Sequence, residues 1–535
     1  VLFIFAVVVC VVYEFRGIPM MAPDILTVQT ATSVMGNYTF KLTFEQYSVI
    51  LVCMAFFFTF LRLHEVKVTE KRVFHIAGFI VVALGCGLFT NQIILSDFME
   101  EHQINIRMFR PMESYQKYGG VLTFARSVGY AVVKKPEGYT TAKVDQIIQE
   151  YEKKSANAQQ STAKQYPNII TVVNETFADI KVLGNFKTNE DYMPYFHSLK
   201  KNCVTGYTYA SIVGGQTANT EFELLTGNTL GFLSAGTTAF QLYIHGQMPS
   251  LVSNLKAEGY SGNKAMHPFN PYNYNRPAVY KDFGFTDFID KFDFPKNVKR
   301  VREYISDEAN VDRIISEYEK NRKKTDQPFY MYNMTIQNHS PYDKDAANFK
   351  QPIKIESSKY DAEANRYLNL IKYSDDSLKQ LTGYFEKCKE PTIILFLGDH
   401  QPRLTDEFMN KITNGQYQTW SSEQMMKRYQ VPFVIWANYD IKEQHIEKTS
   451  MNYIQSILTK TAGVKMTGYQ RFLNEVRKEV PTITSQGYWG KNGKFYQIND
   501  KGSPYYGIIQ KYRMIQYNMM FDKKNRRDSF FEVSK

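Results

Sequence analysis

One segment in the second half of the chain constrains the fold more than any other feature. The apolar run at residues 392–397 ends on Gly398-Asp399-His400, so two metal-ligand side chains follow a stretch with the composition of a buried strand. In open α/β sheets, ligands bind in the crevice outside the carboxyl ends of the strands. The run therefore predicts a buried strand with a polar site at its end.

Similar apolar runs recur along the chain and alternate with helical patterns, as at residues 363–387. The strand candidates are residues 168–174, 329–335, 392–398 and 433–438. Strands that alternate with helices are typical of an α/β fold with a mainly parallel sheet flanked by helices. We expect this main domain to span residues 164–479. The Gly- and Tyr-rich remainder, residues 480–535, predicts a small β-rich or partly irregular C-terminal region.

The first hundred residues contain apolar segments that indicate transmembrane helices. Residues 47–63 and 73–95 are each close to the roughly 20 residues that a spanning helix requires. Residues 1–13 are apolar but shorter, and they start without Met, so we interpret them as a helix cut by the start of the sequence. Residues 1–97 are therefore expected to be an N-terminally truncated set of transmembrane helices.

Loop charge predicts how these helices are oriented. The loop at residues 62–72 is rich in lysine and arginine, and short basic loops stay cytoplasmic. The next helix then runs outward, so the chain beyond residue 97 should be extracellular or periplasmic. Residues 98–163, with a helical run at 143–154 and a soft stretch at 155–164, predict a helical connector to the main domain.

The basic balance of the chain bears on its partners. The formal net charge is +11, which for a soluble protein would raise nucleic acid as a partner. The basic residues are spread along the sequence, however, and no nucleic-acid-binding motif is present. A basic exterior also suits work beside an anionic membrane, so we expect a membrane partner and no nucleic acid.

Further polar side chains follow other predicted strands and turns. Glu175 comes directly after the strand candidate 168–174, and a Gly-rich turn beginning at Gly214 presents the hydroxyl of Thr217. Carboxylate, hydroxyl and imidazole ligands together make a hard-to-borderline metal site with an activatable oxygen nucleophile. That combination is typical of phosphoryl or sulfuryl ester transfer.

At these residues the chain resembles the lipoteichoic acid synthase family, the membrane-anchored phosphoglycerol transferases of the alkaline phosphatase/sulfatase superfamily. The resemblance covers nearly the whole chain, from a loop at residues 22–26 to the end of the main domain. Its strength lies in the order of five short motifs: Pro167-Asn168-Ile169-Ile170 with Asn174-Glu175-Thr176-Phe177, the run from Gly215 to Glu223, His267 with Asn275-Arg276, Asn338-His339-Ser340-Pro341-Tyr342, and Gly398-Asp399-His400.

The resemblance implies a metal-dependent nucleophile in a sulfatase-like catalytic domain. One divalent metal, Mn²⁺ by preference with Mg²⁺ or Zn²⁺ as alternatives, would be held by Glu175, Thr217, Asp399 and His400. Thr217 would be the nucleophile, because metal coordination lowers the pKa of a hydroxyl and orients it. Thr176 and Thr220 are the rival hydroxyls, but only Thr217 occupies the family position.

The resemblance also implies the residues that bind the substrate. His339 would contact the phosphate and donate a proton to the leaving alkoxide. His267, Tyr274 and Arg276 would hold a glycerol phosphate head group, with Tyr274 where well-known members carry tryptophan. Their Pro- and Asn-rich loop, residues 266–277, is expected to fold over the site and not to lie in the core.

The activity implied is transfer of glycerol phosphate from phosphatidylglycerol, through a covalent phosphothreonine, to a cell-envelope acceptor. The acceptor would be a polyglycerolphosphate lipoteichoic acid chain on a glycolipid, or a wall polysaccharide. The enzyme would be a multi-pass protein of a bacterial cell membrane with an extracellular catalytic domain. Phosphoethanolamine transfer is the nearest alternative, and a non-catalytic envelope scaffold is another. Sulfatase chemistry is disfavoured, because the C/S-x-P-S-R motif that supplies its nucleophile is absent.

Overall fold

The computed structural model describes most of the chain, and these residues form two compact units. The described residues are 5–6, 8–10, 19–22, 44–62, 72–96, 98–102, 104, 111–131, 133–155, 165–234, 237–415 and 417–533. Unit 1 comprises residues 1–134 with 234–237, and unit 2 comprises residues 135–233 with 238–535. The predicted basic loop at 62–72, the 22–26 motif, the soft stretch at 155–164 and the segment 1–13 lie largely outside the described residues.

Unit 2 is built around an eight-stranded sheet with the order β10-β2-β9-β8-β1-β7-β3-β4. Its strands are β1 (Asn168–Asn174), β2 (Cys203–Tyr209), β3 (Ser261–Met266), β4 (Asp287–Ile289), β7 (Phe329–Met334), β8 (Thr392–Gly398), β9 (Gln430–Ala437) and β10 (Gln444–Ser450). β9 runs antiparallel to its neighbours β8 and β2, and the other pairs are parallel. The predicted mainly parallel sheet is therefore confirmed, with β9 as the exception.

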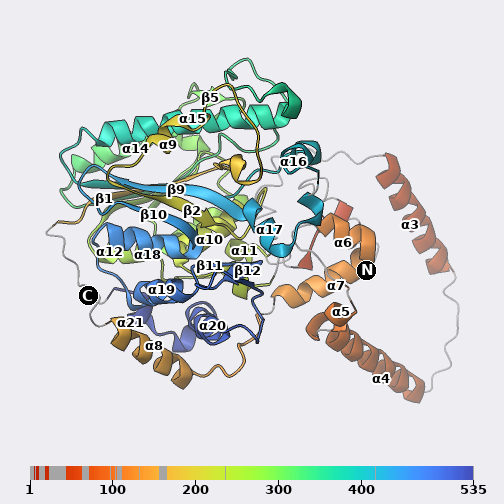
Figure 1. Ribbon diagram of the computed structural model, residues 1–535. Helices are drawn as coiled ribbons and strands as arrows, with labels where there is room; N and C mark the ends of the chain where they lie inside the picture. Colours follow the sequence, from red (N-terminus) through yellow and green to blue (C-terminus); the bar gives the residue numbers. More distant parts are fainter. Residues whose placement is uncertain are drawn as a thin grey trace. The chain divides into compact units, whose positions relative to one another are not determined.

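Helices cover both faces of this sheet (Figure 1). α14 (Asp307–Arg322) and α15 (Ala362–Phe385) pack together on one face, and α10 (Thr217–Thr226), α12 (Leu251–Ala257) and α18 (Met451–Thr461) lie on the other. Every residue of β1, β7 and β8 is buried. Two-sided burial explains why these strands are continuous apolar runs in the sequence and not alternating ones.

The strands that carry no apolar run are those that sequence patterning did not predict. β3 has the sequence SGNKAM, and the edge strand β10 has QHIEKTS with most side chains exposed. An edge or partly covered strand needs few apolar side chains, because its pairing is fixed by backbone hydrogen bonds and by its neighbours. β2 and β4 belong to the same group.

The C-terminal region differs from the predicted β-rich segment. Three short strands, β11 (Thr482–Thr484), β12 (Gly487–Trp489) and β13 (Phe495–Tyr496), form a small sheet, but the 15-residue helix α20 (Tyr506–Met520) follows it. α20 buries Ile509, Tyr512 and Ile515 among other side chains. That spacing is helical, and the tyrosine, methionine and amide residues between these positions obscured it.

The predicted helical run at 143–154 lies within α8 (Thr141–Ser155), and this helix belongs to unit 2. α8 packs against α19 (Gly468–Glu479) and α20. The rings of Tyr151 and Phe472 are 4.6 Å apart, and Glu150 pairs with Lys511 at 2.7 Å. At least this part of the expected connector is therefore integrated into the main domain.

Unit 1 is helical where it is described. It contains α3 (Phe44–Arg62), α4 (Arg72–Phe89), the π-helical turn η2 (Thr90–Leu95), α5 (Phe98–Glu101), α6 (Pro111–Tyr118) and α7 (Gly120–Ala131). Among the described residues, one helical segment, Ile76–Ile94, is long and apolar enough to cross a membrane. It falls within the predicted span at 73–95, whereas the predicted span at 47–63 is a helix that does not meet the same test.

Candidate active site

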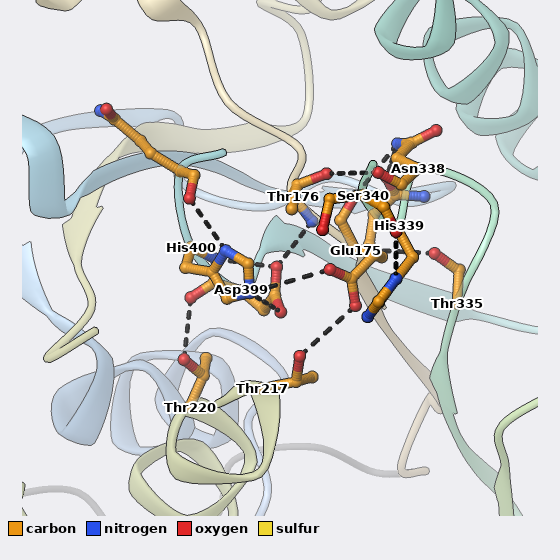
Figure 2. Close-up of polar contacts among 12 residues, drawn as sticks. Glu175, Thr176, Thr217, Thr220, Thr335, Asn338, His339, Ser340, Asp399 and His400 are labelled. Atoms are coloured by element: carbon orange, nitrogen blue, oxygen red, sulfur yellow. Dashed lines mark hydrogen bonds and ion pairs between the residues drawn. The ribbon is translucent and has the colours of Figure 1, made fainter. Parts of the chain in front are cut away.

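Side chains from three elements of unit 2 converge at one end of the central strands. Glu175 follows β1, and Asp399 and His400 follow the adjacent strand β8. The two strands are parallel with Asn174 opposite Gly398, so the residues after them emerge side by side. Thr217 is the first residue of α10 and points toward Glu175 (Figure 2).

The polar atoms of these side chains lie close together. The Thr217 hydroxyl donates to Glu175 Oε2 at 3.4 Å. His400 Nε2 lies 3.1 Å from Asp399 Oδ2 and 3.7 Å from Glu175 Oε1. One ligand atom from each of Glu175, Asp399 and His400 lies within 4.8 Å of the others. The structure thus brings together all four residues that the sequence predicted as metal ligands.

Glycines make this close approach possible. A Cβ added at Gly398 would lie 1.8 Å from the carbonyl oxygen of Phe177, so only glycine allows β8 to deliver Asp399 there. The turn before α10 passes through positive φ at Gly214, Gly215 and Gln216, with φ of 68°, 144° and 66°. Backbone of this kind favours glycine, and the turn sets Thr217 at the helix N-terminus.

Asp399 and His400 are each anchored by a hydrogen bond through one polar atom, and the second polar atom of each lies 3.1 Å from that of the other. Asp399 Oδ1 accepts from the backbone N–H groups of Thr176 and His400 at 2.7 and 2.8 Å. His400 Nδ1 donates to the carbonyl oxygen of Gln401 at 2.9 Å, so Nε2 is the ring atom that lies near Asp399 and Glu175. Asp399 Oδ2 and His400 Nε2 are buried and have no hydrogen-bond partner in the described part of the chain.

The charges of these side chains also indicate that the site is arranged to bind a cation. Burial, and then the charge of nearby Asp399, raise the pKa of Glu175 well above its usual range. Two buried carboxylates this close are unfavourable without a compensating cation. Two carboxylates, a free imidazole nitrogen and a hydroxyl form the mixed oxygen and nitrogen donor set that suits a divalent cation. The residues present therefore fit a divalent metal.

The three threonines at the site are distinguishable by their partners. The Thr176 hydroxyl donates to the carbonyl oxygen of Asn338 at 3.1 Å, and the Thr220 hydroxyl donates to the carbonyl oxygen of Asp399 at 2.8 Å. Both hydroxyls thus stabilise backbone (Figure 2). Of the three, only Thr217 directs its hydroxyl at a carboxylate of the metal-ligand set, so the geometry favours it as the nucleophile.

The predicted head-group residues line the same pocket as Thr217, but two of them are part of the core. His267 follows β3, and Arg276 begins α13 (Arg276–Phe283); they are 2% and 1% exposed. The prediction that their loop folds over the site and avoids the core is therefore wrong for these residues. Tyr274, which lies in the turn η5 (Asn273–Asn275), is half-buried with its ring 5.1 Å from the Arg276 guanidinium.

A buried carboxylate that the sequence analysis left without a role explains this burial. Glu221 lies one turn after Thr217 on α10, and its Oε1 accepts from Nε and Nη2 of Arg276 at 3.0 and 2.7 Å. Its Oε2 accepts from the hydroxyls of Tyr280 and Tyr332 at 2.5 and 3.1 Å. The i, i+4 spacing from the candidate nucleophile was the available signal.

The two pocket histidines outside the metal-ligand set are held by backbone. His267 Nδ1 donates to the carbonyl oxygen of Met334, and His339 Nδ1 donates to that of Ser340. Burial lowers the pKa of His267 well below its usual value and also lowers the pKa of His339. Both rings are therefore mainly neutral near pH 7, with Nε2 as an acceptor.

Comparisons with known proteins agree with the fold and the site. A family model described as Sulfatase matches residues 167–464. A protein of Rhizobium meliloti (strain 1021), named provisionally for cyclic beta-1,2-glucan modification, is 31% identical over 433 residues, which cover 79% of this chain and 65% of that protein. The lipoteichoic acid synthase of Staphylococcus saprophyticus is 24% identical over 383 residues, which cover 67% of this chain and 55% of that protein.

The solved structure of the Streptococcus pyogenes phosphoglycerol transferase GacH, in complex with sn-glycerol-1-phosphate, superposes with a TM-score of 0.61. It is 20% identical and covers 75% of this chain and 100% of its own. Fold and site thus define an α/β protein of the alkaline phosphatase type, with its polar site at the strand ends. The chain belongs to the sulfatase family. Its sequence lacks the C/S-x-P-S-R motif, and the structure places the hydroxyl of Thr217 at the site instead.

Proposed function

We propose that this chain transfers glycerol phosphate from phosphatidylglycerol, through a covalent adduct on Thr217, to a hydroxyl of a cell-envelope acceptor. The observation that carries the proposal is the contact between the Thr217 hydroxyl and Glu175, beside Asp399 Oδ2 and His400 Nε2, two buried atoms that make no hydrogen bond in the described structure. A family member with a threonine hydroxyl at this position is suited to phosphoryl transfer and not to formylglycine-dependent sulfate hydrolysis.

The proposed metal site consists of Glu175, Thr217, Asp399 and His400. A divalent cation, preferably Mn²⁺ with Mg²⁺ or Zn²⁺ as alternatives, would supply charge to activate the hydroxyl and to stabilise the phosphoryl oxygens. Glu175 accepts from the Thr217 hydroxyl and so orients its oxygen toward the pocket.

The reaction proceeds by two displacements at phosphorus. In the first, the Thr217 oxygen forms a bond to phosphorus, the bond to the diacylglycerol oxygen breaks, and diacylglycerol leaves with the proton that Thr217 has lost. In the second, the acceptor oxygen bonds to phosphorus, the Thr217 ester breaks, and the acceptor's proton returns to Thr217. Each step exchanges one P–O bond for another, which gives a ping-pong scheme.

The pocket residues suggest how protons and the head group are handled. A neutral His339 with Nε2 as an acceptor is suited to relay these protons, from Thr217 to the leaving diacylglycerol oxygen in the first displacement and from the acceptor hydroxyl to Thr217 in the second. His267, Tyr274 and Arg276 form the wall against which we place the glycerol. The carboxylate nearest this wall, Glu221, is paired with Arg276, which disfavours an ethanolamine cation.

For the acceptor, the names of the relatives point to two kinds of molecule. The 31% identical relative is named for modification of a cyclic glucan, and the 24% identical relative is a lipoteichoic acid synthase. We therefore propose a glucan or other envelope glycan as one acceptor and a polyglycerolphosphate glycolipid as the other.

The segment Ile76–Ile94 supports a bacterial membrane location, and we propose a multi-pass anchor with the catalytic domain outside the cell.

Mass spectrometry of the intact protein tests the donor and the nucleophile together. After incubation with Mn²⁺ and phosphatidylglycerol in detergent, we expect one glycerophosphate adduct that maps to Thr217. Diacylglycerol release should be much faster from phosphatidylglycerol than from phosphatidylethanolamine. An adduct on another residue would contradict the nucleophile, and equal rates or a preference for phosphatidylethanolamine would contradict the head group.

A further inference from the structure

The pocket contains a second arginine, Arg403, which takes part in none of the steps proposed above. Arg403 lies three residues after His400 and lines the same pocket as Thr217, His339 and Arg276. Unlike Arg276, which is 1% exposed, Arg403 is an exposed side chain. It therefore lies at the outer part of the pocket, where an incoming substrate would pass.

The backbone that carries Arg403 is firmly attached to the turn that leads into Thr217. The N–H of Gly214 donates to the carbonyl oxygen of Gln401 at 2.9 Å, and a Cβ added at Gly214 would lie 3.0 Å from Cβ of Arg403. The Gln401 side chain in turn donates to the carbonyl oxygens of Lys427 and Gln430 at 2.8 and 2.7 Å. The arginine is thus fixed at its base, and only its long side chain is free.

Charge pairing separates Arg403 from the other basic residues of the pocket. The Arg276 guanidinium is neutralised by Glu221 at 2.7 Å, and the two neutral histidines His267 and His339 carry no fixed charge near pH 7. Among the residues that the structure describes, the Arg403 guanidinium has no hydrogen-bond or ion-pair partner. It is consequently a cation without a direct ion-pair partner among those residues, in the same pocket as the proposed nucleophile.

We infer that Arg403 is a further substrate-binding residue, whose unpaired guanidinium binds a phosphodiester anion at the entrance to the pocket. A planar guanidinium presents paired donors that match two phosphate oxygens, which a lysine ammonium does not reproduce. The anion is either the phosphodiester of the lipid donor or, for a polyglycerolphosphate acceptor, the phosphodiester next to its terminal hydroxyl. The inference rests on the proposed function, which it deepens by naming the group that recognises the phosphate.

The test compares Arg403→Gln and Arg403→Lys with the wild-type chain in detergent with Mn²⁺. Lys442→Gln is the matched control, because it removes one exposed positive charge that does not line the pocket. We expect Arg403→Gln to weaken binding of inorganic phosphate, measured by calorimetry, and to slow turnover by about 10- to 100-fold, the loss that one or two charge-assisted hydrogen bonds imply. Arg403→Lys should retain part of the phosphate affinity and turnover that Arg403→Gln loses, and Lys442→Gln should behave as wild type.

The half-reactions identify which phosphodiester is bound. Slower formation of the Thr217 adduct assigns Arg403 to the donor. Normal adduct formation with slower transfer to polyglycerolphosphate, but not to a neutral glucan, assigns it to the acceptor. Wild-type phosphate affinity with wild-type rates in both half-reactions would overturn the inference, as would an equal loss in Lys442→Gln. If the wild-type chain does not use phosphatidylglycerol, the proposed function fails, and the inorganic phosphate titration still decides the role of Arg403.

Discussion

The buried polar groups on the two walls of the pocket differ in whether they have hydrogen-bond partners. On the wall formed by the ends of β1 and β8, Asp399 Oδ2 and His400 Nε2 are buried without a hydrogen-bond partner in the described structure. On the wall formed by His267, Tyr274 and Arg276, the Arg276 guanidinium is paired with Glu221, and Glu221 also accepts from two tyrosine hydroxyls. Since unpaired buried groups cost stability, the first wall is built to receive a ligand and the second to hold its own shape.

Thr217→Ala should separate activity from stability on the first wall. Removing the proposed nucleophilic oxygen should lower turnover on the order of 10⁴-fold or more, while the melting temperature stays close to that of wild type. Thr217→Ser keeps the hydroxyl and should retain part of the activity. Diacylglycerol release by a folded Thr217→Ala protein at a rate near wild type would show that this wall does not carry the chemistry.

Chelation should affect the same wall in a second way. We expect metal-free protein to lose activity on the order of 10³-fold, because cation charge is worth several kcal/mol in phosphoryl transfer, and Mn²⁺ should restore it. Mn²⁺ at 100 times its dissociation constant should also raise the free energy of unfolding by about 2.7 kcal/mol. Elemental analysis together with thermal denaturation checks both, and full activity in metal-free protein would contradict the assignment.

Arg276→Ala should mainly affect stability, in contrast to Thr217→Ala. Loss of the guanidinium leaves Glu221 as an uncompensated buried charge, which costs about 3–5 kcal/mol in the free energy of unfolding. Turnover should fall as well, because the wall that we propose to hold the head group loosens. Chemical denaturation measures the effect, and the double variant Glu221→Gln, Arg276→Met should recover part of it. Lys478→Ala, which breaks an exposed pair with Glu475, is the control and should change stability little.

A smaller effect concerns Glu223, which lies on the same helix as Glu221 but forms no ion pair with the described residues. Burial raises the pKa of Glu223 to about 7 from 4.5, so the folded state holds a proton that the unfolded state releases. Its contribution to stability is therefore complete below about pH 4.5 and is lost as the pH rises through about 7, a change of up to about 3 kcal/mol. Glu223→Gln should remove this dependence, which unfolding at pH 5 and pH 8 would reveal. Equal pH dependence in both proteins would contradict it.

Much of the fold, and the convergence of the proposed metal ligands on one wall, was predictable from the sequence, because both depend on local patterns. Strands such as β8 are continuous apolar runs, and Asp399-His400 follows directly in the chain. The other wall was harder to predict. Glu221 and Arg276 are 55 residues apart, and their pairing depends on how α10 and α13 pack. The i, i+4 spacing places Glu221 on the same face of α10 as Thr217, but neither its pairing with Arg276 nor the burial of Arg276 could be inferred from local periodicity. The same holds for β3 and β10, which are polar in sequence and pair through backbone.

Helix α10 joins the two walls, because Thr217 is its first residue and Glu221 lies one turn later. Grafting the loop at residues 266–277 from a relative with another donor would therefore leave Glu221 without its arginine, unless the graft supplies one. Changing position 221 to suit a new loop would in turn alter the packing of the helix that presents the nucleophile. The loop residues that we propose to set donor preference and the helix that positions Thr217 are thus expected to change together during evolution. An attempt to re-engineer one must exchange α10 together with the loop.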